Sequence, residues 1–305
     1  MLLKKSGGFE ARDPFVFYLD GAWYHLFTVG AAALFLARAR RREELLTADA
    51  VCVFRPEEGT PYSKELWAPE LHLLDGICYI YVACDDGDNA HHRMYILTNG
   101  SRDPLLPYRM LGKLTDETDK WAIDGTVFSH RGQLYTVWSG WEGDENVCQH
   151  LYIAKMSDPH TVSSPRAKIS SPEYDWEQMD SDGITLPFIN EGPCAYEQEG
   201  RLFLLYSASG SWANHYCIGT LELVGDDPMR PDAWRKYPVP ALSQADGWNG
   251  PGHCSVTKAG EESYIAFHVY DGGYERGWDH VHALLAPFTL REGKILLQEE
   301  GEKTE

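Results

Sequence analysis

The sequence has few basic residues for its length, and this shortage excludes two classes of partner. Lys and Arg total 27 among 305 residues, against 46 Asp and Glu, which gives a formal net charge of -19 at pH 7. A field of that sign repels phosphate backbones and anionic lipid surfaces. We therefore expect no nucleic-acid partner and no membrane partner.

Long hydrophobic runs and paired cysteines are also missing. The opening stretch MLLKKSGGFE has a lysine pair but no apolar segment after it, and no later window has the length of a membrane-spanning helix. The seven cysteines are scattered without CxxC pairs, and Cys52, Cys78 and Cys217 lie in apolar runs where a reduced thiol packs as a small hydrophobe. As written, the sequence predicts a cytoplasmic protein, or a secreted one if a signal has been removed.

Five segments share one pattern, in which a strand, a two-residue turn and an aromatic-rich strand follow one another. Their turns are spaced 55 to 68 residues apart and begin near Asp20, Asp75, Arg131, Glu199 and Gly260. That spacing leaves room for two more strands in each unit, and apolar segments such as LFLARA, VCVF, RMYILTN and YRMLGKL supply them. Each unit is therefore predicted to be a four-stranded antiparallel sheet.

Five such sheets in succession predict an all-β fold, a five-bladed β-propeller. A jelly roll or β-sandwich is the main alternative, but its hairpins need not recur at one long period. The stretch RARRREELLTADA contains the one plausible helical turn, which we expect to be a charged excursion between strands. No Pro-, Gly- or Ser-rich linker divides the chain, so residues 1–305 are predicted to form a single domain.

Four ionisable residues occupy nearly the same position in their units. Asp13, Asp124 and His253 lie seven residues before the turns of their units, and Glu191 lies eight residues before its turn. In a propeller, this position is the start of the innermost strand of a blade, at the mouth of the central channel. We therefore expect these four side chains to converge.

Convergent carboxyl groups indicate glycoside hydrolysis, which needs one protonated acid for the leaving oxygen and one ionised base. Glu191, between the apolar lead-in TLPFI and Pro193, is predicted to be the acid, because apolar surroundings raise a carboxyl pKa. Asp13 is predicted to be the base, held ionised by Arg12, although neighbouring side chains in a strand point to opposite faces. Asp124 is predicted to orient Glu191 and to raise its pKa further by like-charge repulsion.

Other polar and aromatic features have simpler interpretations. The segment DDGDN, residues 85–89, does not have the glycine and glutamate pattern of an EF-hand loop, and we expect a solvated turn. His253 by itself is more typical of a hydrogen-bonded channel histidine than of a catalyst or metal ligand. Sugar faces stack on indole rings, but half or more of the tryptophans near predicted strand ends could belong to the core; these are Trp67, Trp121, Trp138, Trp141, Trp212 and Trp248.

At this point the sequence resembles a known family, glycoside hydrolase family 43. The resemblance runs from about Asp13 to His268 and is carried, in this order, by ARDPF, LWAPELH, IDGTVF, INEGPCAYEQEGRLFLLYSAS and GPGHCSV. It implies a five-bladed propeller that acts on arabinose- or xylose-containing glycans. SPEYDWE ahead of the acid motif and GPGH after it are most similar to α-L-arabinofuranosidases. The resemblance thus favours an exo-acting enzyme that releases terminal α-L-arabinofuranosyl residues from arabinan or arabinoxylan oligosaccharides, with a β-D-xylosidase or a bifunctional enzyme as the alternative.

The resemblance also implies roles for single residues. Its general base falls on Asp13, its pKa-modulating aspartate on Asp124 and its general acid on Glu191, with inversion of the anomeric centre in a single displacement. His253 matches a channel histidine that often supports a calcium ion or a water cluster, and no cofactor is otherwise required. Where similar arabinofuranosidases carry arginines in the last blade, this chain has Arg276; the expected substrate-binding residues are therefore Trp67, Trp121, Trp138, Trp212 and Arg276.

Two further classes of propeller compete with a hydrolase. A glycan-binding propeller without turnover is one, because a fold does not imply an activity. A glycoside phosphorylase is the other, and it needs a cluster of Arg, Lys and His side chains to hold phosphate. The presence of all three acids favours the hydrolase, and the acidic character of the expected mouth disfavours phosphate. The partner we expect is a small-molecule or oligosaccharide substrate.

Overall fold

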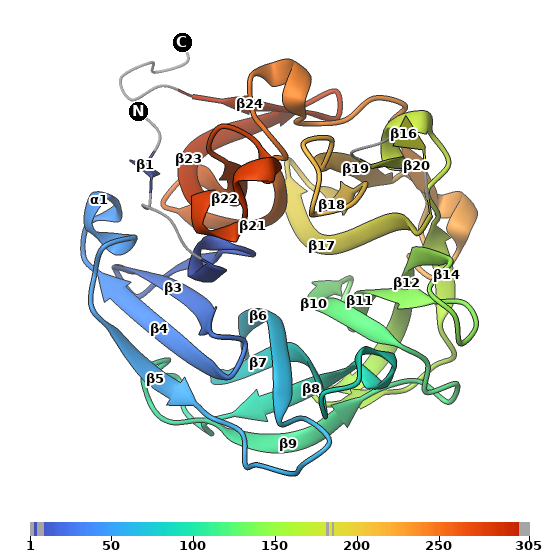
Figure 1. The fold of residues 1–305 in the computed structure, drawn as a ribbon. Helices are drawn as coiled ribbons and strands as arrows, with labels where there is room; N and C mark the ends of the chain where they lie inside the picture. The colour runs from blue at the N-terminus through green and yellow to red at the C-terminus, as the bar shows by residue number, and fades with distance from the viewer. Residues whose placement is uncertain (1–2, 5–8, 181–182, 185, 299–305) are drawn as a thin grey trace.

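The described strands are arranged as the blades of a ring, and neighbouring strands within each blade are antiparallel (Figure 1). The computed structural model describes residues 3–4, 9–180, 183–184 and 186–298. The prediction of a five-bladed β-propeller is confirmed, and the sandwich alternative is wrong. The predicted one-turn helix is present as α1 (Arg42–Leu45), between two outer strands of the first blade.

The first two blades each have four strands in sequential order. Blade 1 consists of β2 (Phe15–Leu19), β3 (Ala22–Val29), β4 (Ala33–Ala39) and β5 (Ala50–Phe54). Blade 2 consists of β6 (Lys64–Leu74), β7 (Ile77–Asp85), β8 (Arg93–Thr98) and β9 (Arg109–Leu114). Both agree with the strands expected from the hairpin pattern.

Blades 3 and 4 are joined, because β12 pairs in parallel with β17 through Cys148 and Gln149. Blade 3 consists of β10 (Ala122–His130), β11 (Gln133–Trp141) and β12 (Cys148–Asp158), with β13 (Thr161–Val162) and β14 (Ala167–Ser170) on the outer edge of β12. Blade 4 consists of β17 (Phe188–Gln198), β18 (Arg201–Ala208), β19 (Cys217–Leu223) and β20 (Trp234–Lys236). A small hairpin of β15 (Met179–Asp180) and β16 (Gly183–Ile184) precedes blade 4.

Blade 5 combines strands from both ends of the sequence. Its first three strands are β21 (Gly252–Ala259), β22 (Glu262–Tyr270) and β23 (Val281–Arg291), and the outer edge of β23 pairs with both β24 (Lys294–Leu297) and β1 (Leu3–Lys4). Short 3₁₀ turns complete the structure: η1 (Phe9–Ala11), η2 (Asn89–His91), η3 (Asp175–Glu177), η4 (Pro231–Ala233), η5 (Gln244–Asp246), η6 (Tyr274–Arg276) and η7 (Trp278–His280). Among the described residues, no helix is long and apolar enough to cross a membrane.

The inner hairpins turn where the sequence predicted. In four of them both central residues have positive φ, as a type I′ turn requires; these pairs are Asp20–Gly21, Asp75–Gly76, Arg131–Gly132 and Glu199–Gly200. The twist of a type I′ turn matches the right-handed twist of the flanking strands. The turns therefore set the register of the inner two strands of each of these blades.

Each blade also has a left-handed residue close to the start of its inner strand. These residues have φ between 42° and 56°, and each lies seven residues before the turn of its blade; they are Asp13, Ala68, Asp124, Gly192 and His253. In blades 2 to 5 the pairing register shifts at this point, as in a β-bulge. The shared position in blade 4 is therefore occupied by Gly192, which corrects the expected equivalence of Glu191 with the other ionisable residues.

The bulge explains why two consecutive residues can face the axis. In a regular strand successive side chains point to opposite faces, but an extra residue interrupts that alternation. The residues just before the left-handed position, Arg12, Trp67, Ile123 and Glu191, thus lie on the same side as the ionisable ring. The expectation that Arg12 and Asp13 point to opposite faces is wrong, because both precede β2 and Asp13 has a left-handed backbone with φ of 48°, so the alternation of a strand does not apply to them.

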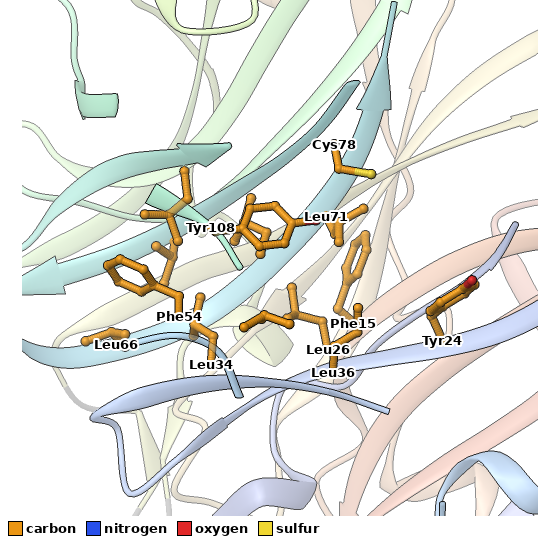
Figure 2. Packing of buried hydrophobic residues seen from close by; sticks show 14 of the residues in the cluster. Phe15, Tyr24, Leu26, Leu34, Leu36, Phe54, Leu66, Leu71, Cys78 and Tyr108 are labelled. Atoms are coloured by element: carbon orange, nitrogen blue, oxygen red, sulfur yellow. The ribbon is translucent and has the colours of Figure 1, made fainter. Parts of the chain in front are cut away.

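Apolar side chains fill the spaces between neighbouring blades. Figure 2 shows one such cluster, in which Leu26, Leu34 and Leu36 of blade 1 pack with Leu66 and Leu71 of blade 2. Similar clusters join blades 2 and 3, 3 and 4, 4 and 5, and 5 and 1. Burial of this apolar surface holds the sheets face to face and leaves the axis lined by the inner strands.

The cysteines follow the sequence prediction with one exception. All seven are free, and Cys78 and Cys217 are buried as expected of small hydrophobes. Cys52 is exposed, because it lies on β5, the outermost strand of blade 1, where one face of the strand meets solvent. The apolar run around Cys52 did not reveal that the strand is an edge.

A buried ion pair anchors the segment that leads into blade 4. Glu177 is fully buried and accepts hydrogen bonds from Lys236 Nζ at 3.0 Å, from Tyr206 Oη at 2.9 Å and from Asn190 Nδ2 at 2.9 Å. The Asn190 side chain also accepts a hydrogen bond from Ser170 Oγ at 2.7 Å. Glu177 thus fixes the residue that immediately precedes Glu191.

This pair predicts a large stability effect. Lys236→Met leaves the Glu177 carboxylate buried without its cation, and we expect a loss of about 3–5 kcal/mol in the free energy of unfolding. Arg230→Ala breaks an ion pair with Asp232 in which both side chains are about two-thirds exposed, and we expect little or no loss in the free energy of unfolding because solvent screens the pair. Urea unfolding of both variants tests the difference, and equal losses would contradict it.

Candidate active site

A pocket of about 340 Å³ lies at the end of the propeller where the inner strands begin. Its size is at the lower end of the range of small-molecule sites, roughly 300–1,000 Å³. Residues from all five blades contribute to its lining: Arg12, Asp13, Glu65, Trp67, Asn89, Trp121, Ile123, Asp124, Asn146, Gln149, Glu191, Ser211, Trp212, His253 and Trp278. The four ionisable residues that were expected to converge, Asp13, Asp124, Glu191 and His253, are all among them.

Asp13 is surrounded by positive and polar groups. Its Oδ1 lies 3.2 Å from His253 Nδ1, and its backbone N–H donates to His268 Nδ1 at 3.3 Å. Burial lowers the pKa of His268 to about 3, so its imidazole is neutral and accepts that hydrogen bond. Burial alone would raise the pKa of Asp13, but the charges of His253 and Arg12 outweigh it and hold that pKa below its ordinary value. Asp13 is therefore ionised.

Glu191 lies in the opposite electrostatic situation. Its Oε1 accepts a hydrogen bond at 2.8 Å from Tyr216 Oη, which comes from a fully buried ring. Burial, and then repulsion by Asp124, raises the pKa of Glu191 to about 8. This carboxyl group is therefore protonated at neutral pH, in a pocket where Asp13 is not.

Asp124 contacts the Glu191 segment through a backbone hydrogen bond and interacts with Asp13 and Glu191 through charge. Its Oδ2 accepts a hydrogen bond at 3.1 Å from the N–H of Gly192, the residue after Glu191, and lies 3.9 Å from His253 Nδ1. Burial is the main reason that the pKa of Asp124 rises to about 6, and repulsion by Asp13 adds to it. Asp124 thus holds the Glu191 segment in place and repels a negative charge there.

Two glycines permit this close arrangement. Gly192 has φ of 53°, and a Cβ at this position would lie 3.2 Å from the His253 ring. A Cβ on Gly252 would lie only 2.0 Å from the ring of Tyr216, the hydrogen-bond donor to Glu191. Any side chain at either position would displace a group that contacts a carboxyl of the pocket.

Four tryptophans line the pocket together with the carboxyl groups. Trp67 and Trp121, with Asn89, come from blade 2 and the start of blade 3. Trp212 and Trp278 come from the loops after β18 and β22, and each ring is more than one-third exposed. The pocket lining therefore combines ionisable groups with indole rings, a combination typical of sugar sites.

The sequence pattern of Glycosyl hydrolases family 43 matches residues 8–295, which include every residue of this pocket. The chain belongs to this family. It is therefore a glycoside hydrolase, and both the family and the enzyme class predicted from the sequence are confirmed.

Several relatives of this family 43 chain have names that refer to arabinose. The Extracellular exo-alpha-(1->5)-L-arabinofuranosidase of Streptomyces chartreusis is 32% identical over 271 residues, which cover 85% of this chain and 80% of that protein. A protein of the same name from Streptomyces avermitilis is 32% identical over 268 residues, but the chain spans only 54% of its length. The crystal structure of an alpha-L-arabinofuranosidase from Lactobacillus brevis superposes with a TM-score of 0.82 at 29% identity, covering 93% of each chain.

Three of the five predicted substrate-binding residues of the family 43 chain line the pocket, and two do not. Trp138 is buried in the apolar cluster between blades 2 and 3, because it points away from the axis on β11. Arg276 is exposed on η6, where it donates to the Asp271 backbone carbonyl at 3.2 Å. The prediction that these two residues bind substrate is corrected accordingly.

Arg12 and Trp278 line the pocket, and neither was among the substrate-binding residues predicted from the sequence. The Arg12 guanidinium donates to Ser211 Oγ at 3.1 Å and lies 4.0 Å from the centre of the Trp278 ring. Among the described lining residues, Arg12 is the sole Arg or Lys. The sequence had predicted that the pocket cation would come from the last blade. The ARDP motif contained the signal, but only the left-handed backbone of Asp13, before β2 begins, reveals that both Arg12 and Asp13 face the pocket.

The expected calcium site near His253 is not supported by the donor set. Within the described residues, no group of three or more His, Cys, Asp or Glu side chains is arranged to hold a metal ion. The His253 ring lies beside the Asp13 carboxylate, and the charges of Asp13 and Asp124 raise its pKa although burial opposes them. A raised pKa favours the imidazolium, which cannot coordinate a metal.

The pKa values of the buried pair are testable directly. We expect the Glu191 carboxyl to titrate near pH 8, and Asp124→Asn to lower that pKa because a like charge is removed. Carbon-13 NMR of glutamate-labelled protein, with Glu191→Gln used to assign the signal, measures the shift.

A matched control removes a carboxylate that is remote from the pocket. Asp226 pairs with Arg131 and is largely exposed, so Asp226→Asn should leave the pKa of Glu191 unchanged. Titration of Glu191 near its ordinary value of 4.5 in the wild-type protein would contradict the described electrostatics.

Proposed function

We propose that the chain is an exo-acting α-L-arabinofuranosidase that releases terminal arabinofuranosyl residues from arabinan or arabinoxylan oligosaccharides and inverts the anomeric centre. The observation that carries the proposal is the pairing, in one pocket, of an ionised Asp13 with a protonated Glu191. Glycoside hydrolysis by inversion needs one carboxyl group in each of these states. The names of the two Streptomyces relatives and of the Lactobacillus brevis structure support the choice of sugar.

In the proposed reaction Asp13 is the general base. It accepts a proton from the water that attacks the anomeric carbon, while Glu191 donates its proton to the leaving oxygen of the glycosidic bond. The imidazolium of His253 and the guanidinium of Arg12 keep Asp13 ionised before attack. The proton count is unchanged, because Asp13 gains one proton from water while Glu191 loses one to the leaving oxygen. Exchange with solvent then returns Asp13 to its ionised state and Glu191 to its protonated state.

Asp124 modulates Glu191 in this proposal and does not contact the reacting bond. Its repulsion keeps the acid protonated, and its hydrogen bond to the Gly192 N–H holds the segment that carries the acid. Tyr216 holds Glu191 Oε1, so the proton resides on Oε2, the oxygen left to face substrate. Loss of Asp124 should therefore lower activity mainly through the protonation state of Glu191.

The alternatives considered from the sequence are less well supported. A β-D-xylosidase is not favoured, because the relatives named above are arabinofuranosidases. A phosphorylase would need several cations, and Arg12 and His253 are the cationic groups among the described lining residues. A binding module without turnover would have no need of two carboxyl groups held in opposite protonation states.

The expected cytoplasmic location stays a prediction, and the relatives favour a different one. Two of them are named as extracellular proteins. We propose that this chain also acts outside the cell, where its glycan substrates would occur. Fractionation of the native producer, with the activity followed in medium and cell extract, distinguishes the two locations.

A panel of nitrophenyl glycosides and pentose oligosaccharides tests the proposed activity. We expect release of arabinose as the only small product from arabino-oligosaccharides and at least about tenfold lower kcat/KM on β-xylosides. Proton NMR taken before mutarotation should show the β-anomer first, as inversion requires. Internal cleavage of arabinan, or initial release of the α-anomer, would refute exo action or inversion respectively.

Substitution of the acids separates their roles. Glu191→Gln should abolish hydrolysis of oligosaccharides but spare part of the rate on activated aryl glycosides, because a good leaving group needs little protonation. Asp13→Asn should suppress both reactions by roughly 100-fold or more, because no leaving group replaces the base. Asp226→Asn again serves as the control with unchanged kinetics.

Azide provides a second readout for the base. In Asp13→Asn it should restore turnover by occupying the position of the attacking water, and the product should be a glycosyl azide of inverted configuration. The assignment would be overturned if Glu191→Gln lost activity equally on oligosaccharides and on activated aryl glycosides, or if azide rescue gave a product of retained configuration.

A further inference from the structure

The segment Asp85 to His92 is built around two buried side chains, and this corrects the expectation of a solvated turn. Asp86 and Asp88 are exposed as expected, but Asp85 and His92 have no exposed side-chain surface. The Asp85 Oδ1 accepts a hydrogen bond from the N–H of Gly87 at 2.8 Å, which closes the turn. A buried carboxylate and a buried imidazole in a loop require a reason beyond solubility.

The His92 ring has polar contacts at both of its nitrogen atoms. Its Nε2 donates to the backbone carbonyl of Glu65 at 3.1 Å, and its Nδ1 lies 3.0 Å from Asp85 Oδ2. The contact with Asp85 is one of distance and charge, because neither Nδ1 nor Oδ2 makes a hydrogen bond with the described residues. Two fixed contacts on opposite sides define the plane of this ring.

The His92 ring packs against both Trp67 and Trp121, which line the pocket. The Trp67 ring stacks on His92 with centroids 4.0 Å apart, and the edge of His92 meets Trp121 at 6.3 Å. The Trp121 Nε1 donates to the carbonyl of Asn89, in the same segment, at 2.8 Å. Trp141 stacks on Trp121 at 4.6 Å. Each indole thus has a ring packed against it and also lines the pocket.

We propose that Asp85 and His92 are positioning residues that hold Trp67, with the buried Trp121 beside it, as an aromatic platform for one pentose unit of the substrate. The proposal rests on the proposed function for the identity of the sugar, but the support itself is a property of this chain. A sugar that stacks on a rigid indole gains contact area without the entropy cost of ordering the ring. Such contacts are made equally in the ground state and the transition state, so they lower KM without changing kcat.

The test compares Asp85→Ala, Asp85→Asn and His92→Ala with wild type. We expect Asp85→Ala and His92→Ala to raise KM for arabino-oligosaccharides roughly tenfold, with kcat within about twofold. Asp85→Asn should keep a nearly wild-type KM, because its amide donates to Nδ1 of a neutral His92. The pH profile of kcat should not move, because neither residue contacts the acid or the base.

Leu221→Ala is the matched control for general loss of stability. Leu221 is buried in the cluster between blades 3 and 4, away from the pocket lining. This variant should lower Tm while leaving KM unchanged. If Leu221→Ala raises KM as much as His92→Ala does, or if Asp85→Ala binds oligosaccharide as wild type does, the positioning role is wrong.

A second measurement needs no substrate and separates this inference from the proposed activity. Tryptophan fluorescence should change in Asp85→Ala, and most of that change should disappear in a Trp67→Phe background, because Trp67 stacks directly on His92. If wild type hydrolyses no arabinoside, the proposed function fails. The fluorescence comparison of Asp85→Ala with and without Trp67→Phe still tests the positioning role. A fluorescence change that is the same with and without Trp67 would overturn the inference.

Discussion

Asp13 and the buried Asp124 and Glu191 share one small pocket, and the chemistry of this protein depends on which of these three carboxyl groups carry a negative charge. The cations His253 and Arg12 lie closest to Asp13, so that group keeps the negative charge. Burial and the nearby Asp124 then raise the pKa of Glu191 to about 8. The separation of protonation states is a consequence of position within the pocket, since the isolated groups differ little in acidity.

The propeller provides these positions through a repeated backbone feature. A left-handed residue near the start of each inner strand interrupts the alternation of side chains, so two consecutive residues of a blade can reach the pocket. Arg12 and Asp13 use this arrangement, and so do Ile123 and Asp124. In blade 4 the left-handed residue is Gly192, whose N–H is hydrogen-bonded to Asp124 while Glu191 fills the preceding position.

Buried groups that do not line the pocket also fix the residues that do. Glu177 and Lys236 fix Asn190, the neighbour of the acid, through hydrogen bonds inside the protein. His92, which contacts Asp85, packs against Trp67 and Trp121. A site assembled from five separate sheets needs such supports, because errors of about an ångström at reacting groups cost large factors in rate.

The sequence by itself determined the repeat, and the repeat determined the fold. Five turns at one long period, each followed by an aromatic-rich strand, predicted the five blades, and the ordered motifs from ARDPF to GPGHCSV predicted the family. Asp13, Asp124 and His253 were found because each lies seven residues before the turn of its blade, and Glu191 because it lies one residue earlier, so all four reach the same end of the axis. Information of this kind is local and periodic, so it is visible along the chain.

Tertiary structure alone decided which other residues join them. Trp138 and Trp121 look alike in sequence, but the register of β11 turns Trp138 toward a neighbouring blade while Trp121 lines the pocket. Arg12, and not Arg276, lines the pocket, next to Asp13 with its left-handed backbone, and the alternation pattern of the sequence does not show this. Asp85 is buried because His92, seven residues later, folds back against it. These outcomes depend on contacts between segments distant in sequence or on single backbone angles, and neither leaves a periodic trace in the amino-acid order.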